Sequence, residues 1–119
     1  MVEKSNMKLC KWQNGRQESC EYKKLPLFIF KIGKFGFDCY ILKYKENQVL
    51  PEHTDPVKNA KHWRLNIGYG TANFVCEKVI FGKKIGKLTV YIFRPDLHKH
   101  SLYIFEKTTK VSFGFAKYD

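Results

Sequence analysis

The chain has 119 residues, with 22 Lys and Arg against 11 Asp and Glu, so its formal net charge is +11. A chain of this length fits one domain and can bury a core without disulfide or metal staples. The longest apolar run, residues 25–30, is too short to span a bilayer, and residues 1–24 contain no apolar stretch of a secretory signal. We therefore expect a cytoplasmic protein with no membrane contact.

The positive charge would speed encounters with polyanions such as nucleic acid. The lysines are spread along the whole chain, however, so the charge indicates solubility as readily as nucleic-acid binding. The nearest approach to a cluster is Lys83, Lys84 and Lys87, which surround two residues that we interpret as turns, Gly82 and Gly86.

Short runs of aromatic and β-branched residues, divided by Gly, Pro and Lys, predict a mainly β protein. The first 24 residues have the weakest pattern and are predicted to form an edge strand or a mobile arm. No segment keeps a helical period for long, so helix content should be low. The spacing of the runs indicates a sandwich or barrel, with strands near residues 27–32, 35–44, 62–69, 74–76, 87–93, 99–105 and 110–116.

The cysteines show no C-x-x-C spacing, which argues against a structural zinc site. In a reducing cytoplasm they should be free thiols, although a disulfide stays open if the compartment is oxidising. They are Cys10, Cys20, Cys39 and Cys76.

Two of the expected strands have one apolar and one polar face. Over residues 62–69 the polar face carries His62, Arg64 and Asn66, and over residues 110–115 it carries Lys110 and Ser112. Because side chains alternate across a strand, the apolar faces could pack in a core while the polar faces meet water. Alternatively, the polar faces could line a cavity while the apolar faces pack under another layer. The alternation does not choose between these two arrangements.

A possible metal site is visible where two ligand types stand two residues apart. On an extended backbone, His53 and Asp55 would point to the same side and could bind one cation. A third ligand could come from His98 or His100, which lie near each other later in the chain. Two histidines and one carboxylate on one face of a metal are the pattern of non-haem Fe(II) oxygenases.

Three pieces of sequence occur in the order and spacing of a known enzyme family. The first is His53-Thr54-Asp55, which is followed by Pro56. The second is Phe93-Arg94-Pro95-Asp96, which leads to a distal histidine followed by Ser101. The third is a basic residue, Lys110, about ten positions later. Together they make the stretch from about residue 40 to 115 resemble the catalytic core of the Fe(II)- and 2-oxoglutarate-dependent dioxygenases, particularly the prolyl-hydroxylase-like branch.

The resemblance implies a fold and a metal. The fold is a double-stranded β-helix, a jelly-roll or cupin-like barrel of about eight strands with few helices. Residues 35–119 would form the catalytic core, and residues 1–34 would pack on it as a strand or arm of the same single domain. Fe(II) would be held by His53, Asp55 and His100, while His98, the rival for the distal position, would lie beside the site.

The resemblance also implies 2-oxoglutarate as co-substrate. Its distal carboxylate would pair with Lys110, where the family more often has arginine, and would receive help from the Ser112 hydroxyl. Tyr44 resembles the family's co-substrate-contacting tyrosine. A cation suits this place because a buried carboxylate is costly unless it is paired.

The activity implied is hydroxylation of a C–H bond by an oxidoreductase that uses O2 and converts 2-oxoglutarate to succinate. The substrate class stays open between a protein or peptide and a nucleic acid. Two other classes of function are possible on the same residues. One is a cupin-like binding module without turnover, and the other is a nucleic-acid-binding β-barrel with aromatic stacking platforms.

Overall fold

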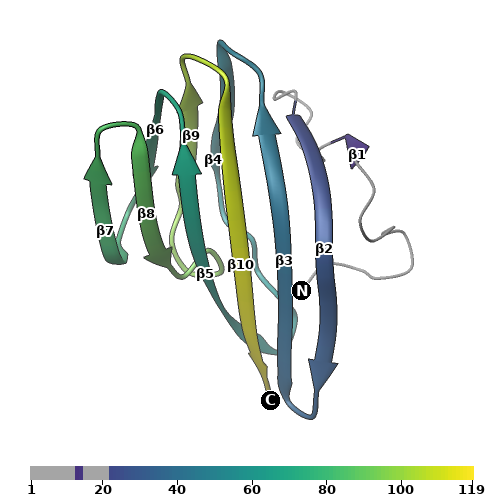
Figure 1. Ribbon diagram of the computed structural model, residues 1–119. Helices are drawn as coiled ribbons and strands as arrows, with labels where there is room; N and C mark the ends of the chain where they lie inside the picture. The colour runs from purple at the N-terminus through teal and green to yellow at the C-terminus, as the bar shows by residue number, and fades with distance from the viewer. Residues whose placement is uncertain (1–12, 15–21) are drawn as a thin grey trace.

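A computed structural model describes residues 13–14 and 22–119, and the regular secondary structure of these residues is entirely β (Figure 1). The strands form a seven-stranded and a three-stranded sheet. They are β1 (Gln13–Asn14), β2 (Tyr22–Ile32), β3 (Phe35–Tyr44), β4 (Gln48–His53), β5 (Ala60–Tyr69), β6 (Ala72–Cys76), β7 (Val79–Ile85), β8 (Leu88–Phe93), β9 (His100–Ile104) and β10 (Thr108–Tyr118).

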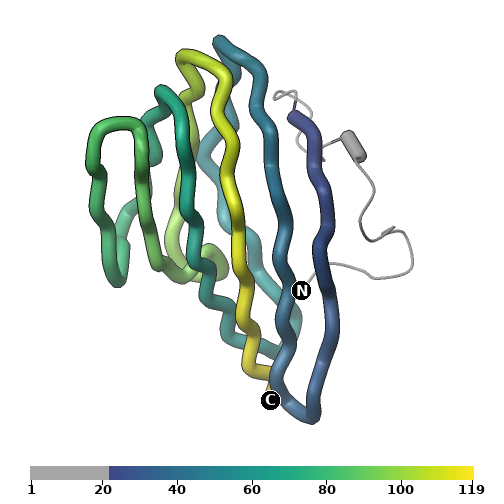
Figure 2. The backbone as a smooth tube through the Cα atoms, viewed as in Figure 1, coloured from purple at the N-terminus to yellow at the C-terminus, as the bar shows by residue number. Residues whose placement is uncertain are grey.

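The chain winds back and forth between the two sheets (Figure 2). After β3 it crosses to the small sheet for β4, returns for β5, crosses again for β6, and returns for β7 and β8. It then crosses for β9 and ends in β10. The resulting orders are β1-β2-β3-β10-β5-β8-β7 and β4-β9-β6, with antiparallel pairing. This winding is a double-stranded β-helix, so the predicted jelly-roll, cupin-like fold class is confirmed.

Two strands lie outside the predicted ranges for physical reasons. In β4, Pro51 and Glu52 interrupt any run of strand-forming residues. In β7 every residue is exposed, so no buried face imposes an alternation on the sequence. The turn predicted at Gly82 is wrong, because Gly82 lies inside β7 opposite Tyr91. A Cβ at this position would come within 3.1 Å of the Tyr91 ring. The turn is made instead by Gly86, whose φ of +58° favours glycine.

The predicted N-terminal region is described only in part. Residues 1–12 and 15–21, which carry Cys10, Cys20 and most of the expected arm, lie outside the described residues. From Tyr22 onward, β2 runs beside β3 as a full strand of the large sheet. Cys39 and Cys76 are free thiols. Within the described residues the structure contains no helix with the length and apolarity needed to cross a membrane.

The hydrophobic core lies between the two sheets. In the second half of β3 every second residue enters it, because side chains alternate across a strand. The small sheet supplies the opposite wall, and each buried side chain of this size contributes roughly 1.5–3 kcal/mol. The buried members are Tyr40, Leu42, Tyr44, Leu50, Leu102 and Ile104.

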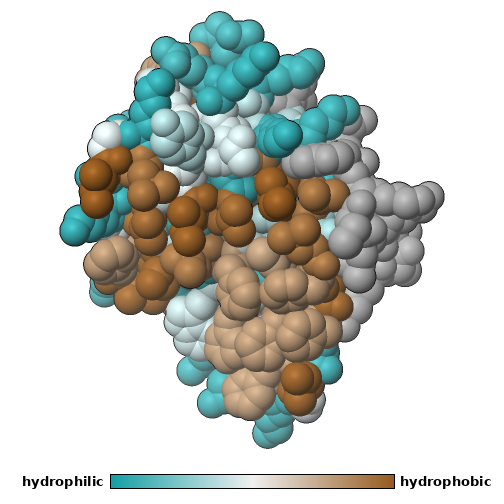
Figure 3. Space-filling model, viewed as in Figure 1, coloured by the Kyte–Doolittle hydropathy of each residue, from teal (hydrophilic) through white to brown (hydrophobic). Residues whose placement is uncertain are grey.

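Two strands of the large sheet, β5 and β10, have polar residues on the inner face and apolar residues on the outer face. On β5 and β10 the inward residues include Arg64, Asn66 and Ser112, which line a cavity. The outward residues include Ile67 and Phe113, which are 41% and 38% exposed. Figure 3 shows the apolar side chains gathered on this outer face. The polar strand faces therefore line a cavity, as one of the two expected arrangements had it, and the apolar faces stay partly exposed.

Candidate metal centre

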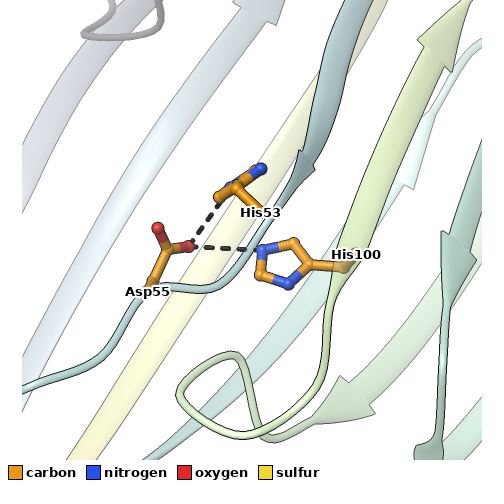
Figure 4. Close-up of side chains that lie close together, drawn as sticks. All are labelled: His53, Asp55 and His100. Atoms are coloured by element: carbon orange, nitrogen blue, oxygen red, sulfur yellow. Dashed lines mark hydrogen bonds and ion pairs between the residues drawn. The ribbon is translucent and has the colours of Figure 1, made fainter.

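Three side chains, from two neighbouring strands of the small sheet and the loop after one of them, come together in the cavity wall (Figure 4). His53 is the last residue of β4 and is paired in register with His100, the first residue of β9. Asp55 follows two residues later in the connecting loop, where its backbone N–H donates to the carbonyl of Pro95 at 2.7 Å. Strand pairing and one loop hydrogen bond thus position the three residues.

Hydrogen bonds orient both imidazole rings in the same way. His53 Nδ1 lies 2.6 Å from the carbonyl oxygen of Pro51, and His100 Nδ1 lies 3.1 Å from that of His98. A carbonyl oxygen can only accept, so each Nδ1 carries the hydrogen. Each Nε2 therefore points toward Asp55. The Oδ2 atom of Asp55 lies 3.5 Å from His53 Nε2 and 3.2 Å from His100 Nε2. Such bonds from the remote ring nitrogen are the usual support of metal-binding histidines.

Aromatic packing covers the histidine side of the group. The rings of His53 and His100 lie 4.4 Å apart, and Phe93 packs edge-on against His100 at 5.1 Å. His100 and Phe93 are buried, whereas the side chain of Asp55 is 51% exposed. The group therefore has a dry side formed by the core and an open side at Asp55.

The electrostatics favour a charged pair in the absence of a metal. Burial raises the pKa of Asp55, but hydrogen bonds from His100 and His53 outweigh it and hold the pKa well below its usual range. The hydrogen bond with Asp55 raises the pKa of His53, against the opposing effects of burial and of the nearby Lys110 charge. Asp55 is thus an anion at neutral pH, as a metal ligand must be.

The donor set fits a divalent transition metal. One ligand atom from each residue lies within 4.8 Å of the others. Imidazole nitrogen suits iron and zinc, and the combination of two histidines with one carboxylate leaves coordination positions open. The residues present could therefore hold Fe(II), with both Nε2 atoms and the carboxylate as ligands.

The residues predicted to bind the co-substrate line the same cavity. It has a volume of about 370 Å³ and includes Tyr44, Lys110 and Ser112 in its wall, together with all three possible metal ligands. Lys110 Nζ lies 5.2 Å from the centre of the Tyr44 ring. The structure therefore brings together residues that are up to 66 positions apart, from Tyr44 to Lys110.

Ser112 and His98 both form hydrogen bonds with other residues of the chain. The Ser112 hydroxyl donates to Asn66 Oδ1 at 2.5 Å and accepts from Arg64 Nη1 at 2.7 Å, so its proton is already used. His98 is not part of the three-residue group, and it contributes its backbone carbonyl to His100.

Several residues of the cavity wall were not selected from the sequence. They include Lys24, Asp38 and Tyr40, together with Arg64 and Asn66. Arg64 and Asn66 could have been found from the polar face of residues 62–69. They line the cavity if that face points inward, which was one of the two arrangements considered. Asp38 had no comparable signal, because its neighbours Phe37 and Cys39 resemble ordinary strand residues.

Comparison with known proteins supports the fold. No protein-family model matches the sequence, and no curated protein matches it significantly. Among solved structures, KdgF from Halomonas sp. is similar with a TM-score of 0.58 and 12% identity over 92% of this chain and 87% of that one. The Cnp3 cupin domain of Schizosaccharomyces pombe is similar with a TM-score of 0.50 and 15% identity over 92% and 69%. The chain therefore has a cupin-like β fold, with a His-Asp-His group that could hold a metal ion.

Proposed function

We propose that the protein is an Fe(II)- and 2-oxoglutarate-dependent dioxygenase that hydroxylates a C–H bond of its substrate. One observation carries the proposal: His53, Asp55 and His100 converge in the cavity that also contains Lys110. A metal site alone would suit many functions. A cation in the same cavity supplies the partner that an organic acid bound at the metal requires.

Each residue has a definable role in this proposal. His53 and His100 bind Fe(II) through Nε2, and the carbonyls of Pro51 and His98 keep the rings in that orientation. Lys110 pairs with the distal carboxylate of 2-oxoglutarate. Phe93 excludes water from the histidine side, which strengthens the electrostatic interactions inside.

The iron, with 2-oxoglutarate and O2, supplies the oxidising power for the hydroxylation. One oxygen atom of O2 goes into succinate as CO2 is lost, and the other becomes the hydroxyl group of the product. The residues of this chain orient the reactants around the metal. The strongly basic chain favours a nucleic acid or an acidic protein as the substrate, and the family resemblance is the support for a peptide.

A cupin-like metal-binding module without turnover is the second candidate. Its support is that the hydroxyl proton of Ser112 is held by Asn66, which leaves Lys110 with less help in binding a carboxylate. The two candidates differ in whether 2-oxoglutarate binds at the metal.

The test is an anaerobic titration with Fe(II) and then 2-oxoglutarate, followed by the weak visible charge-transfer band of the chelate. We expect the band in the wild type, its loss in His53→Ala and His100→Ala, and its retention in the control His98→Ala. Lys110→Ala should raise the 2-oxoglutarate concentration needed by about tenfold or more, since a charge-assisted bond contributes about 1.5–3 kcal/mol. Iron binding by the wild type without any band would favour the module without turnover.

A further inference from the structure

Besides Lys110, the cavity wall contains two further basic side chains, Lys24 and Arg64. Arg64 lies on the inner face of β5, opposite Gly114 of β10. On the other side of β10, Gly114 is paired with Asp38 of β3. The guanidinium forms an ion pair with Asp38 that reaches across β10, and both side chains line the cavity.

Gly114 makes room for this ion pair. A Cβ atom at position 114 would overlap both the Arg64 guanidinium and the Asp38 carboxylate. Asp38 is fully buried, and its ion pair with Arg64 fixes the position of the guanidinium. The aromatic ring of Tyr40 adds a wall, with its centre 5.6 Å from Arg64 Cζ. Arg64 is therefore a preorganised group rather than a mobile surface side chain.

Arg64 has more N–H donors than its two hydrogen bonds use. Its Nη2 donates to Asp38 Oδ1 and its Nη1 donates to Ser112 Oγ. A guanidinium has more N–H groups than these two bonds use, and the remaining ones have no acceptor among the described residues. Its side chain is 14% exposed, and it forms part of the cavity wall.

The other arginine–aspartate pair shows the contrasting, closed arrangement. Arg94 Nε donates to the carbonyl of His62 at 3.1 Å and to Asp96 Oδ1 at 2.9 Å, and its Nη2 donates to Asp96 Oδ2 at 2.5 Å. Arg94 thus binds one carboxylate through two of its nitrogens, and it does not line the cavity. Arg64 contacts its aspartate through one nitrogen.

The co-substrate does not account for Arg64. In the register of β5 and β10, Lys110 is opposite Gly68 and Gly114 is opposite Arg64, so four residues separate the two cations. This separation is roughly 13 Å between Cα atoms along the strand, and the hydrogen bond with Ser112 shows that Arg64 leans toward Lys110. A diacid with one carboxylate on Lys110 and its other end on the metal has no further carboxylate for Arg64.

We propose that Arg64 binds a carboxylate group of the substrate that is oxidised at the metal. The identity of that anion as substrate rests on the proposed function, whereas the anion site itself does not. Asp38 already offsets the formal charge of Arg64, so the site offers hydrogen-bond donors to a singly charged group. A planar, singly charged carboxylate matches the planar arginine fork, which can donate two parallel hydrogen bonds to it.

The test uses metal-free, isotope-labelled full-length protein and the side-chain Nε–H signals of its arginines in NMR spectra. The probes are acetate and inorganic phosphate, titrated separately. We expect a saturable shift of the Arg64 signal with acetate at concentrations that leave the Arg94 signal unmoved. Phosphate should bind more weakly. In Arg64→Gln, the acetate-induced shift of the Gly114 backbone amide should weaken by about tenfold or more.

The outcomes separate this inference from the proposed function. If the Arg64 signal shifts only at the acetate concentration that also shifts the Arg94 signal, Arg64 does not bind acetate specifically and the inference is overturned. Phosphate binding as tight as acetate binding overturns the carboxylate assignment. An iron chelate band without an Arg64 response removes this inference alone. An Arg64 response without a chelate band removes the proposed enzyme and leaves a carboxylate-binding cavity.

Discussion

The inner face of the large sheet contains a region of buried polar side chains, whereas its outer face carries half-exposed apolar side chains. The inner face buries Asp38, His62 and Ser112, which are polar or ionisable. The outer face leaves Ile67 and Phe113 about two-fifths exposed, although these are among the most apolar residues of the same strands. The comparison teaches that on these strands the polar residues mark the side that faces the cavity.

The two faces should therefore respond differently to mutation. A buried polar group is costly once its partner is removed, because it can no longer be solvated. A half-exposed apolar side chain has already forfeited much of its burial energy. Substitutions that break the inner network should cost most, and those on the outer face should cost least.

The largest effect is expected for Asp38→Ala. It leaves the Arg64 guanidinium as an uncompensated charge, so the free energy of unfolding should fall by about 3–5 kcal/mol. Urea unfolding at neutral pH measures this change. In the matched double variant, Asp38→Leu with Arg64→Met, most of the loss should be recovered because no lone charge remains. If Asp38→Ala costs no more than an outer-face substitution, the contrast between the faces is wrong.

A pH-dependent loss of stability should come from His62. Burial, with a smaller contribution from the Arg64 charge and against the opposing charge of Asp38, lowers the pKa of His62 to about 4 from an ordinary 6.5. Between these values only the unfolded chain takes up the proton, so stability is complete above the ordinary pKa and falls as the pH drops toward 4. The loss should be about 3 kcal/mol.

The measurement for His62 is the free energy of unfolding at pH 7 and at pH 4. Other groups also titrate in this interval, so the control is His62→Gln measured at both values. The variant should lose about 3 kcal/mol less than the wild type on acidification. Equal losses in both proteins would mean that His62 titrates normally.

A smaller effect is expected for Gly114→Ala. The added methyl group displaces the Arg64–Asp38 ion pair, and overpacking of this kind costs about 1–3 kcal/mol. The control is Gly68→Ala on the inner face of β5, where the new methyl group would meet the Thr89 hydroxyl at 3.0 Å and otherwise only the distant Thr109 carbonyl. Thermal unfolding of both variants should show the larger decrease in Tm for Gly114→Ala.

The smallest effect is expected on the outer face. Ile67→Thr keeps the β-branched shape at a half-exposed position, so it should cost less than about 1 kcal/mol and should raise the solubility of the protein. The inward control Leu102→Ala, in the hydrophobic core, should cost about 2–5 kcal/mol. If Ile67→Thr costs as much as Leu102→Ala, the outer face is covered in solution and the contrast must be redrawn.

Much of the fold could be predicted because strands with one buried face have a period of two. The predicted strand 35–44 coincides with β3. In contrast, β7 was not predicted, because none of its residues is buried. Part of the possible metal site could be predicted from the sequence, since His53 and Asp55 are only two residues apart. Their meeting with His100 and Lys110 depends on strand pairing between distant segments, which the sequence indicated only through a family resemblance.

The sequence by itself determined a mainly β, basic, single-domain-sized chain with its ligand types two residues apart, because composition and local period act within a few residues. Only the tertiary structure decided that the polar faces of β5 and β10 point into a cavity, since alternation is the same whichever face turns inward. It also decided that Arg64 pairs with Asp38 across Gly114. That contact requires three strands, distant in sequence, to lie in one register, which no local pattern encodes.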